Sequence, residues 1–300
     1  FFSSFVQVLG LQIFGLWVVC NYSWVLGGLI YGLVVGRNGL LMHDMGHRAF
    51  FCNTRLDKLV HTYFFALGIT GSATFWNNQH NKHHAATQEL VHDVDLNTLP
   101  VVAFHKEVAK DGSIAYLKYQ WLVFLPAQLL LFFFWKFTHF RHAVRTSNWP
   151  EAFSIVAHQV LTLGVCIAYG AGVWGWIVYQ AIGYAWGGFY LATVFSLNHT
   201  HRPVAAQYAQ RNWVIRSVEY TTNSTPSAFT HWLTGYLCYQ IEHHLFPNMP
   251  HPRLAQVAPR VRALLKKHNV LYDCRPVEDA MATVMINLYN VPRDDDVKQA

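Results

Sequence analysis

Five long apolar runs constrain the fold of this 300-residue chain more than any other feature. They cover residues of about 4–20, 24–42, 117–138, 152–169 and 172–197. An apolar α-helix needs about 20 residues to cross a bilayer. Because 53% of the residues are hydrophobic and only 13% are charged, the chain is unlike a soluble globule. The sequence predicts an all-α integral membrane protein.

The turns and the flanking charges suggest how these runs are arranged. A short polar turn around residues 21–23 predicts a transmembrane hairpin over about 4–42, and a glycine-rich turn around 170–175 predicts a second over about 152–197. The run at 117–138 has basic residues before and after it, which places both of its ends on the cytoplasmic side and predicts an interfacial segment. The stretch at 59–75 is too short to cross. We therefore expect four transmembrane helices in two hairpins.

The remainder completes a single predicted membrane domain over residues 1–300. From about 198 to 300 the hydropathy falls, which predicts a helical cytoplasmic cap. No Lys or Arg precedes Arg37, so the first run lacks the basic segment of a signal peptide and is expected to be a retained helix.

Charge and cysteine content exclude other classes of protein. The net charge is +6, but the basic residues are dispersed and form no stripe with stacking aromatics, so we expect no nucleic-acid partner. A basic surface facing anionic membrane lipid is the simpler explanation. The five cysteines form no CxxC pair, which argues against a disulfide framework or a zinc ribbon and for a reducing compartment.

Histidines at helical spacing indicate a metal site. The chain has 18 histidines, and they include the patterns HDMGH at 43–47, HNKHH at 80–84 and QIEHH at 240–244. Positions i, i+3 and i+4 share one face of a helix, so each pattern presents its imidazoles together. The triple in HNKHH has a chance expectation below roughly one in ten on this composition. So many histidines exceed the four ligands of one tetrahedral zinc, which favours two metal ions.

Ligand type alone leaves zinc, copper, iron and nickel open. The sequence has no HExxH motif, nucleophile elbow, P-loop or dinucleotide-binding spacing, so the metal must carry the chemistry. Two irons held by nitrogen could activate oxygen for attack on an unactivated C–H bond, and a membrane setting suggests a lipid substrate. Histidines that share one site must lie on one side of the membrane. The two predicted hairpins meet this condition.

Four segments carry a resemblance to a known family. HDMGHRAF, WNNQHNKHHAATQELVHDVDLNTLP, FSLNHTH and HWLTGYLCYQIEHHLFPNMPHPRL resemble the histidine boxes of the membrane fatty acid desaturases, over roughly Arg37 to Tyr272. Gln240, which opens the third box, is similar to the front-end desaturases of delta-4, delta-5, delta-6 or sphingolipid delta-8 type. The resemblance implies that the ligands of two irons are His43, His47, His80, His83, His84, His199, His243 and His244.

Several neighbours of these ligands are candidates for supporting roles. His201 is the rival of His199, which the match of FSLNH favours. Gln240 stands where a ninth ligand would be, and an amide there is expected to bond a water or a neighbouring ligand. Metal-bound imidazoles usually donate their other N–H to a carboxylate or carbonyl, and ordinary helix capping is the alternative role for such acids. The candidates for the carboxylate role are Asp44, Asp93, Asp95 and Glu242.

The resemblance also implies an activity. We expect an oxygen-dependent desaturase that uses two Fe ions and O2 to introduce a cis double bond into a polyunsaturated acyl chain, carried as an acyl lipid or as acyl-CoA. The sequence has no His-Pro-Gly-Gly haem motif, so electrons are expected from an external donor such as cytochrome b5 or ferredoxin, or from a cytochrome domain outside this sequence. The expected location is the endoplasmic reticulum or a bacterial or plastid membrane, with the active site on the cytoplasmic or stromal face.

Two alternatives stay open at this point. A di-iron lipid hydroxylase would use the same site and give a different product. A histidine-rich membrane metal transporter or sensor would use the histidines along an ion path, although here they cluster at helix ends and in loops.

Overall fold

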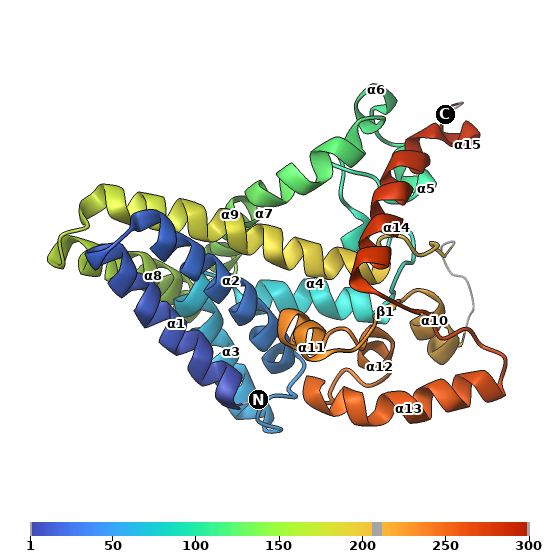
Figure 1. Ribbon diagram of the computed structural model, residues 1–300, viewed down its shortest axis with the longest axis horizontal. Helices are drawn as coiled ribbons and strands as arrows, with labels where there is room; N and C mark the ends of the chain where they lie inside the picture. Colours follow the sequence, from blue (N-terminus) through green and yellow to red (C-terminus); the bar gives the residue numbers. More distant parts are fainter. Residues whose placement is uncertain (1, 206–211, 299–300) are drawn as a thin grey trace. The chain divides into compact units, whose positions relative to one another are not determined.

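The computed structural model describes residues 2–205 and 212–298, and the regular secondary structure within them is almost entirely helical (Figure 1). The strands of this described part are β1 (Asn223–Ser224) and β2 (Cys274–Arg275), which form one parallel pair. The predicted helical class is therefore confirmed. The chain forms two compact units, the first from residues 1–77 and 128–192 and the second from residues 78–127 and 193–300. The expectation of one membrane domain stays a prediction.

The first unit contains the apolar helices. Its elements are α1 (Phe2–Asn21), α2 (Trp24–Gly46), α3 (Thr54–Ile69), the start of α4 (Ala73–Ala85), most of α7 (Gln120–Arg145), α8 (Trp149–Ala168) and most of α9 (Gly172–His199). Only Tyr22 and Ser23 separate α1 from α2, and Ser23 Oγ caps α2 by accepting a hydrogen bond from Leu26 N at 3.3 Å. Gly170 and Gly172 have φ of +87° and +67° in the turn between α8 and α9, a backbone conformation that glycine adopts without strain.

Four helices of the described residues are long and apolar enough to cross a membrane. They are Ser3–Asn21, Trp24–Gly46, Gln120–Arg145 and Trp149–Ala168. This group differs from the predicted spans at one place, because it includes α7 instead of α9. The difference has a compositional reason. Helix α9 holds Gln180 and many Gly, Trp and Tyr residues, which lower its mean hydropathy, whereas the charged residues of α7 all lie in its C-terminal half and leave a long apolar stretch before them.

Small residues allow α2 and α9 to approach closely within the first unit. A Cβ atom placed on Gly187 would lie 2.3 Å from Val35 Cγ1, and one on Gly183 would lie 2.1 Å from Tyr31 Cδ1. Close backbone approach at small residues is a usual way for membrane helices to pack.

The second unit consists mainly of shorter helices. Besides the ends of α4, α7 and α9 it contains η1 (Val94–Leu96), α5 (Lys106–Ala109), α6 (Ile114–Leu117), α10 (Trp213–Glu219), β1, α11 (Ala228–Thr234), α12 (Gln240–Leu245), α13 (His251–Lys267), β2, α14 (Val277–Asn290), η2 (Val291–Arg293) and α15 (Asp295–Lys298). The spacing of Leu254, Val261 and Leu265 places them on one buried face of α13, where Val261 and Leu265 pack against Val218 and Ile241. This packing fixes α12, which carries the third histidine box.

Candidate metal centre

Three helices supply the predicted ligand histidines that lie in the second unit. His80, His83 and His84 lie on α4, His199 is the last residue of α9, and His243 and His244 lie on α12. All six residues of α12 are buried. A buried helix that carries several imidazoles needs partners for their nitrogens, since unsatisfied buried polar groups are costly.

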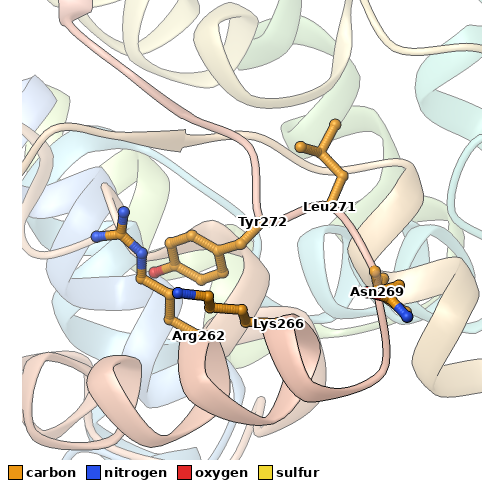
Figure 2. Close-up of a pocket in the computed structure, with 6 residues that line it drawn as sticks. Arg262, Lys266, Asn269, Leu271 and Tyr272 are labelled. Carbon is orange, nitrogen blue, oxygen red and sulfur yellow. The ribbon is translucent and has the colours of Figure 1, made fainter.

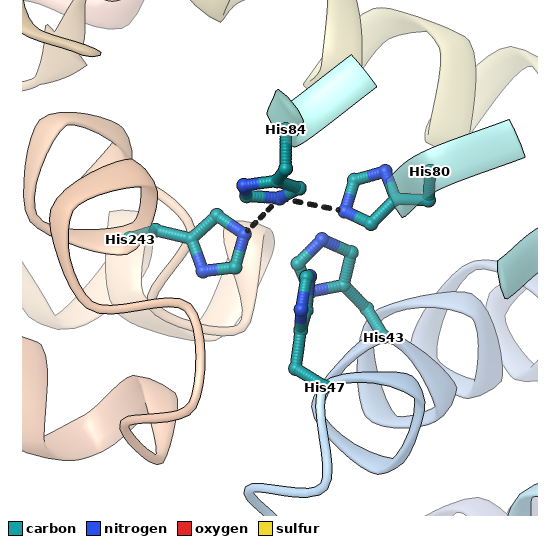
Figure 3. A group of neighbouring side chains, drawn as sticks. All are labelled: His43, His47, His80, His84 and His243. Carbon is teal, nitrogen blue, oxygen red and sulfur yellow. Dashed lines mark hydrogen bonds between the residues drawn. The ribbon is translucent and has the colours of Figure 1, made fainter. Parts of the chain in front are cut away.

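His80, His84 and His243 form the first group of imidazoles. One ring nitrogen from each lies within 4.8 Å of those of the other two. His84 Nε2 is 3.0 Å from His80 Nε2 and 3.1 Å from His243 Nε2, as the dashed lines in Figure 3 show. A neutral imidazole binds a metal through its unprotonated ring nitrogen, and here three Nε2 atoms converge. A metal cation satisfies all three at once, and these residues therefore fit a metal.

His83, His199 and His244 form the second group, whose ring nitrogens also lie within 4.8 Å of one another. In each ring the Nδ1 atom faces an acceptor. His83 Nδ1 is 3.0 Å from Asp93 Oδ2, His199 Nδ1 is 2.9 Å from the Tyr220 carbonyl, and His244 Nδ1 is 3.2 Å from Thr87 Oγ1. These acceptors favour the tautomer that is protonated on Nδ1, in which the lone pair lies on Nε2, the nitrogen that would bind a metal.

Asp93 holds His83 most firmly. Its carboxylate is shielded from solvent and accepts hydrogen bonds from Gln88 N at 2.7 Å and Asp95 N at 3.0 Å. Asp95 lies 3.3 Å from the same Nδ1, with its side chain 58% exposed. Burial alone lowers the pKa of His83, but the two carboxylates outweigh burial and raise this pKa to about 9. Both acids therefore contact an imidazole in the geometry expected of supporting carboxylates.

Gln240 faces the second group through its amide. Its Nε2 atom lies 3.1 Å from His199 Nε2 and 3.3 Å from His244 Nε2, and Asn198 Nδ2 donates to its Oε1 at 3.2 Å. The amide is therefore within reach of anything that these two imidazoles bind.

Glu242 makes contacts that the sequence did not indicate. Its carboxylate accepts hydrogen bonds from Asn223 Nδ2 at 2.8 Å and Tyr272 OH at 2.9 Å, and Asn223 Oδ1 accepts from Ile241 N at 2.8 Å. Burial raises the pKa of Glu242, and the hydrogen bonds from Asn223 and Tyr272 only partly offset this effect. These contacts secure the first turn of α12. Asn223 and Tyr272 come from distant parts of the sequence, so no local spacing could have revealed them.

His43 and His47 belong to the first unit, at the end of α2. His43 lies in the last turn, His47 follows it as the C-cap, and their ring centroids are 4.8 Å apart. Figure 3 draws both rings on this helix. The Trp76 ring packs edge-on against them at 5.3 and 6.0 Å, and a Cβ atom on Gly46 would lie 2.1 Å from that ring. Asp44 is buried on the same turn.

The structure distinguishes His199 from His201, and it places two residues beside the histidine groups that the sequence did not indicate. His201 Nε2 faces Thr222 Oγ1 at 3.1 Å, and His201 is in neither group. Thr87 was missed by the sequence analysis, although its spacing from His83 is helical. So was His251, which is buried with its ring 5.3 Å from that of His243.

The chain is similar to known desaturases along most of its length. A family model described as "Fatty acid desaturase" matches residues 22–276. An acyl-lipid (8-3)-desaturase of Rebecca salina is 37% identical over 293 residues, which are 95% of this chain and 68% of that protein. A protein of the same name from Thraustochytrium sp is 36% identical over 297 residues, again 95% and 68%. A Delta(8)-fatty-acid desaturase of Euglena gracilis is 28% identical over 281 residues, 88% and 67%.

Helices that are long and apolar enough to cross a membrane and buried histidine groups that fit a metal define a membrane protein with a metal-binding centre, and its desaturase relatives make it an oxidoreductase. The chain belongs to the fatty acid desaturase family. Its similarity to these relatives places it among the front-end desaturases, the subgroup that Gln240 predicted.

Proposed function

We propose that this protein introduces a cis double bond into a polyunsaturated acyl chain carried on a membrane lipid, with two irons and O2. The observation that carries the proposal is the pair of imidazole groups in the second unit, each able to supply three nitrogens to one metal. The names of the two relatives at 37% and 36% identity support an acyl-lipid substrate.

His80, His84 and His243 would hold one iron, and His83, His199 and His244 the other. The sequence pattern adds His43 and His47 as the remaining ligands. When bound, iron supplies the power to activate oxygen for breaking unactivated C–H bonds, which side chains alone lack. In the overall reaction two hydrogens leave adjacent methylenes, a donor supplies two electrons, solvent supplies two protons, and O2 becomes two molecules of water.

The residues around the imidazoles prepare them for this role. Asp93, Thr87 and the Tyr220 carbonyl keep three rings in one tautomer and orientation, so little reorganisation is needed when metal binds. His83, His243 and His244 are at most 3% exposed, so water has little access to them. We propose that Gln240 hydrogen-bonds a water or ligand at the centre and is not itself a metal ligand.

His83→Ala provides the direct test. The variant is expected to lose desaturation in cells fed defined polyunsaturated fatty acids, with less iron in the purified protein, because one imidazole of the second group is gone. Locating the new double bond in the products would fix the regiochemistry. Full activity of His83→Ala, or a wild-type protein that binds no iron, would contradict the proposal. A hydroxylated product would indicate a hydroxylase, and metal transport without oxygen consumption a transporter.

We also propose that an acidic electron donor, such as cytochrome b5 or ferredoxin, docks on the exposed basic face of α13. Arg262 and Lys266 line a surface pocket of about 440 Å³ beside Tyr272 (Figure 2). The Arg262 guanidinium lies 5.7 Å from the centre of the Tyr272 ring, whose hydroxyl bonds Glu242 next to His243. This surface therefore connects through two side chains to the third box. Charge attraction would speed docking and would weaken with salt.

Charge reversal tests the docking surface. Arg262→Glu/Lys266→Glu is expected to weaken binding of the purified donor at least 10-fold at low salt and to leave turnover driven by a chemical reductant unchanged. Lys110→Glu/Lys118→Glu is the matched control, since both lysines are exposed in the same unit and the charge change is equal. Equal loss of donor binding in both variants would argue against a specific site on α13.

A further inference from the structure

Glu151 is a buried carboxylate that the metal centre does not use. It lies in the first turn of α8, in the first unit, and is 0% exposed. A buried carboxylate is costly unless hydrogen bonds compensate for its lost hydration. The groups that hydrogen-bond Glu151 therefore indicate why the chain has a carboxyl group at this buried position.

The partners of Glu151 all lie at the start of α4. Its Oε1 atom accepts hydrogen bonds from Thr74 N at 2.9 Å and from Thr74 Oγ1 at 2.8 Å, and its Oε2 atom accepts from Ser72 Oγ. Asn148 Nδ2 donates to Thr74 Oγ1 at 2.9 Å, and His139 Nδ1 accepts from Ser72 N at 2.8 Å. The segment Ser72–Thr74 is thus held by hydrogen bonds from α7, from α8 and from the turn before α8.

The segment Ser72–Thr74 forms the N-terminus of α4. Ser72 Oγ also accepts a hydrogen bond from Phe75 N at 3.1 Å, so Ser72 acts as the N-cap. The first turn of α4 has no acidic residue of its own. Glu151 supplies a carboxyl group from α8, which accepts a hydrogen bond from the Thr74 N–H, a first-turn donor with no partner inside its own helix.

The second histidine box, His80, His83 and His84, lies further along α4, which is one continuous helix from Ala73 to Ala85. A shift of α4 by one residue would move these imidazoles by about 1.5 Å along the axis and turn them by about 100°. Metal ligands require placement far finer than that. The residues that fix the start of α4 therefore fix where its histidines point.

We propose that Glu151 is a positioning residue for the second histidine box, acting through the N-terminus of α4. This inference rests on the proposed function in one respect, namely that the box binds metal. Glu151 lies 71 residues after His80 in the sequence, and no pattern in the chain links the two.

Two measurements on purified protein in detergent test the proposal. Hydrogen–deuterium exchange across residues 73–85 reports the anchoring of α4 without any metal, and Co²⁺ titration followed by visible absorption reports the geometry of the imidazoles. We expect Glu151→Ala to raise exchange in this helix, to weaken Co²⁺ binding about 10-fold and to change its absorption bands. Glu151→Gln, which keeps some of the hydrogen bonds, should show smaller changes in the same direction.

Thr162→Val is the matched control, because Thr162 is a buried, hydrogen-bonded residue of the same helix. It should lower thermal stability without altering exchange in α4 or Co²⁺ binding. Should Glu151→Ala not fold, Thr74→Val removes the hydroxyl donor to Glu151 while the Ser72 cap stays in place, and it is expected to give the effect of Glu151→Gln. Normal exchange and normal Co²⁺ spectra in the Glu151 variants would overturn the proposal. A wild-type protein that binds no Co²⁺ would instead count against the metal centre, while the exchange data would still decide the anchoring.

Discussion

At the scale of single residues, the imidazoles of the second group depend on their Nδ1 partners. These partners differ in strength, since Asp93 is a carboxylate whereas Thr87 and the Tyr220 carbonyl are neutral. Thr87 has a second contact, because its hydroxyl donates to the His83 carbonyl at 2.8 Å while Oγ1 faces His244 Nδ1 at 3.2 Å. One hydroxyl therefore joins the second and third histidine boxes.

Replacement of Thr87 by Val tests this link. The variant keeps the shape of the side chain and loses the acceptor for His244 Nδ1, so we expect iron affinity to fall about 10-fold, as is typical when such a partner is removed. Thr87→Ser keeps the hydroxyl and should bind iron normally. Metal content after dialysis against a competing chelator measures the effect. Wild-type iron retention in Thr87→Val would show that this hydrogen bond is dispensable.

Asp273 gives a prediction about pH. Its carboxylate binds Arg202 Nη1 at 2.7 Å and Arg275 Nε at 2.8 Å, next to β2. Burial raises the pKa of Asp273, but the two guanidinium groups outweigh burial and hold it below its usual value. The resulting stability is present above pH of about 4 and is lost as the pH falls through the lowered folded-state pKa.

Asp273→Asn should therefore destabilise the protein by about 1 to 3 kcal/mol at pH 7, the range for hydrogen bonds to charged groups. The difference from wild type should shrink as the pH falls from about 4 through the lowered folded-state pKa, because Asp273 is protonated in both states only below that pKa. Thermal unfolding in detergent across this pH range is the measurement, with Asp295→Asn as an exposed control. A difference that does not change with pH would rule out the ionic contribution.

At the scale of elements, glycines decide how closely α2 and α9 pack. The sequence by itself predicts that both segments are apolar and that each forms a helix. The face of α9 that meets α2 was not readable from the sequence, because in neither helix are the apolar residues confined to one face. The close approach of Gly187 to Val35 settles that choice within the first unit.

Gly187→Ala should destabilise this packing. The added Cβ would lie 2.4 Å from Val35 Cβ, an atom that cannot move without the backbone, so we expect a cost of about 1 to 3 kcal/mol, as for overpacking elsewhere. Gly164→Ala on α8 is the control, since no atom lies within 4 Å of the added Cβ. Melting temperature and monodispersity in detergent would measure both. Equal stability of the two variants would contradict the packing argument.

At the scale of the whole molecule, we predict which helices cross the membrane. Four helices are long and apolar enough to cross, and they include α7, which has basic residues at both ends. We hold to two hairpins, α1 with α2 and α8 with α9, because this arrangement returns His43, His47 and His199 to one side. The basic flanks of α7 then keep both of its ends on that side.

Glycosylation tags test this path. A tag at Asn21 or Gly170 should be glycosylated in the lumen, whereas a tag at the exposed Asn269 should not, because that residue belongs to the predicted cytoplasmic cap. If the tag at Asn269 were glycosylated and the tags at Asn21 and Gly170 were not, the protein would have the opposite orientation in the membrane. Modification of only one hairpin tag would mean that a different set of helices crosses.

The sequence by itself determined the helical membrane class, the three histidine boxes and the desaturase family, because hydropathy and helical spacing are local properties. Asp93 was also found from the sequence, since it lies ten residues from its partner His83. The tertiary structure alone decided that Tyr220 supports His199, that Tyr272 and Asn223 hold Glu242, and that Glu151 grips α4. These partners come from separate helices and loops. Periodicity reports which face a residue occupies, but only the packing of one element against another selects the atom it meets.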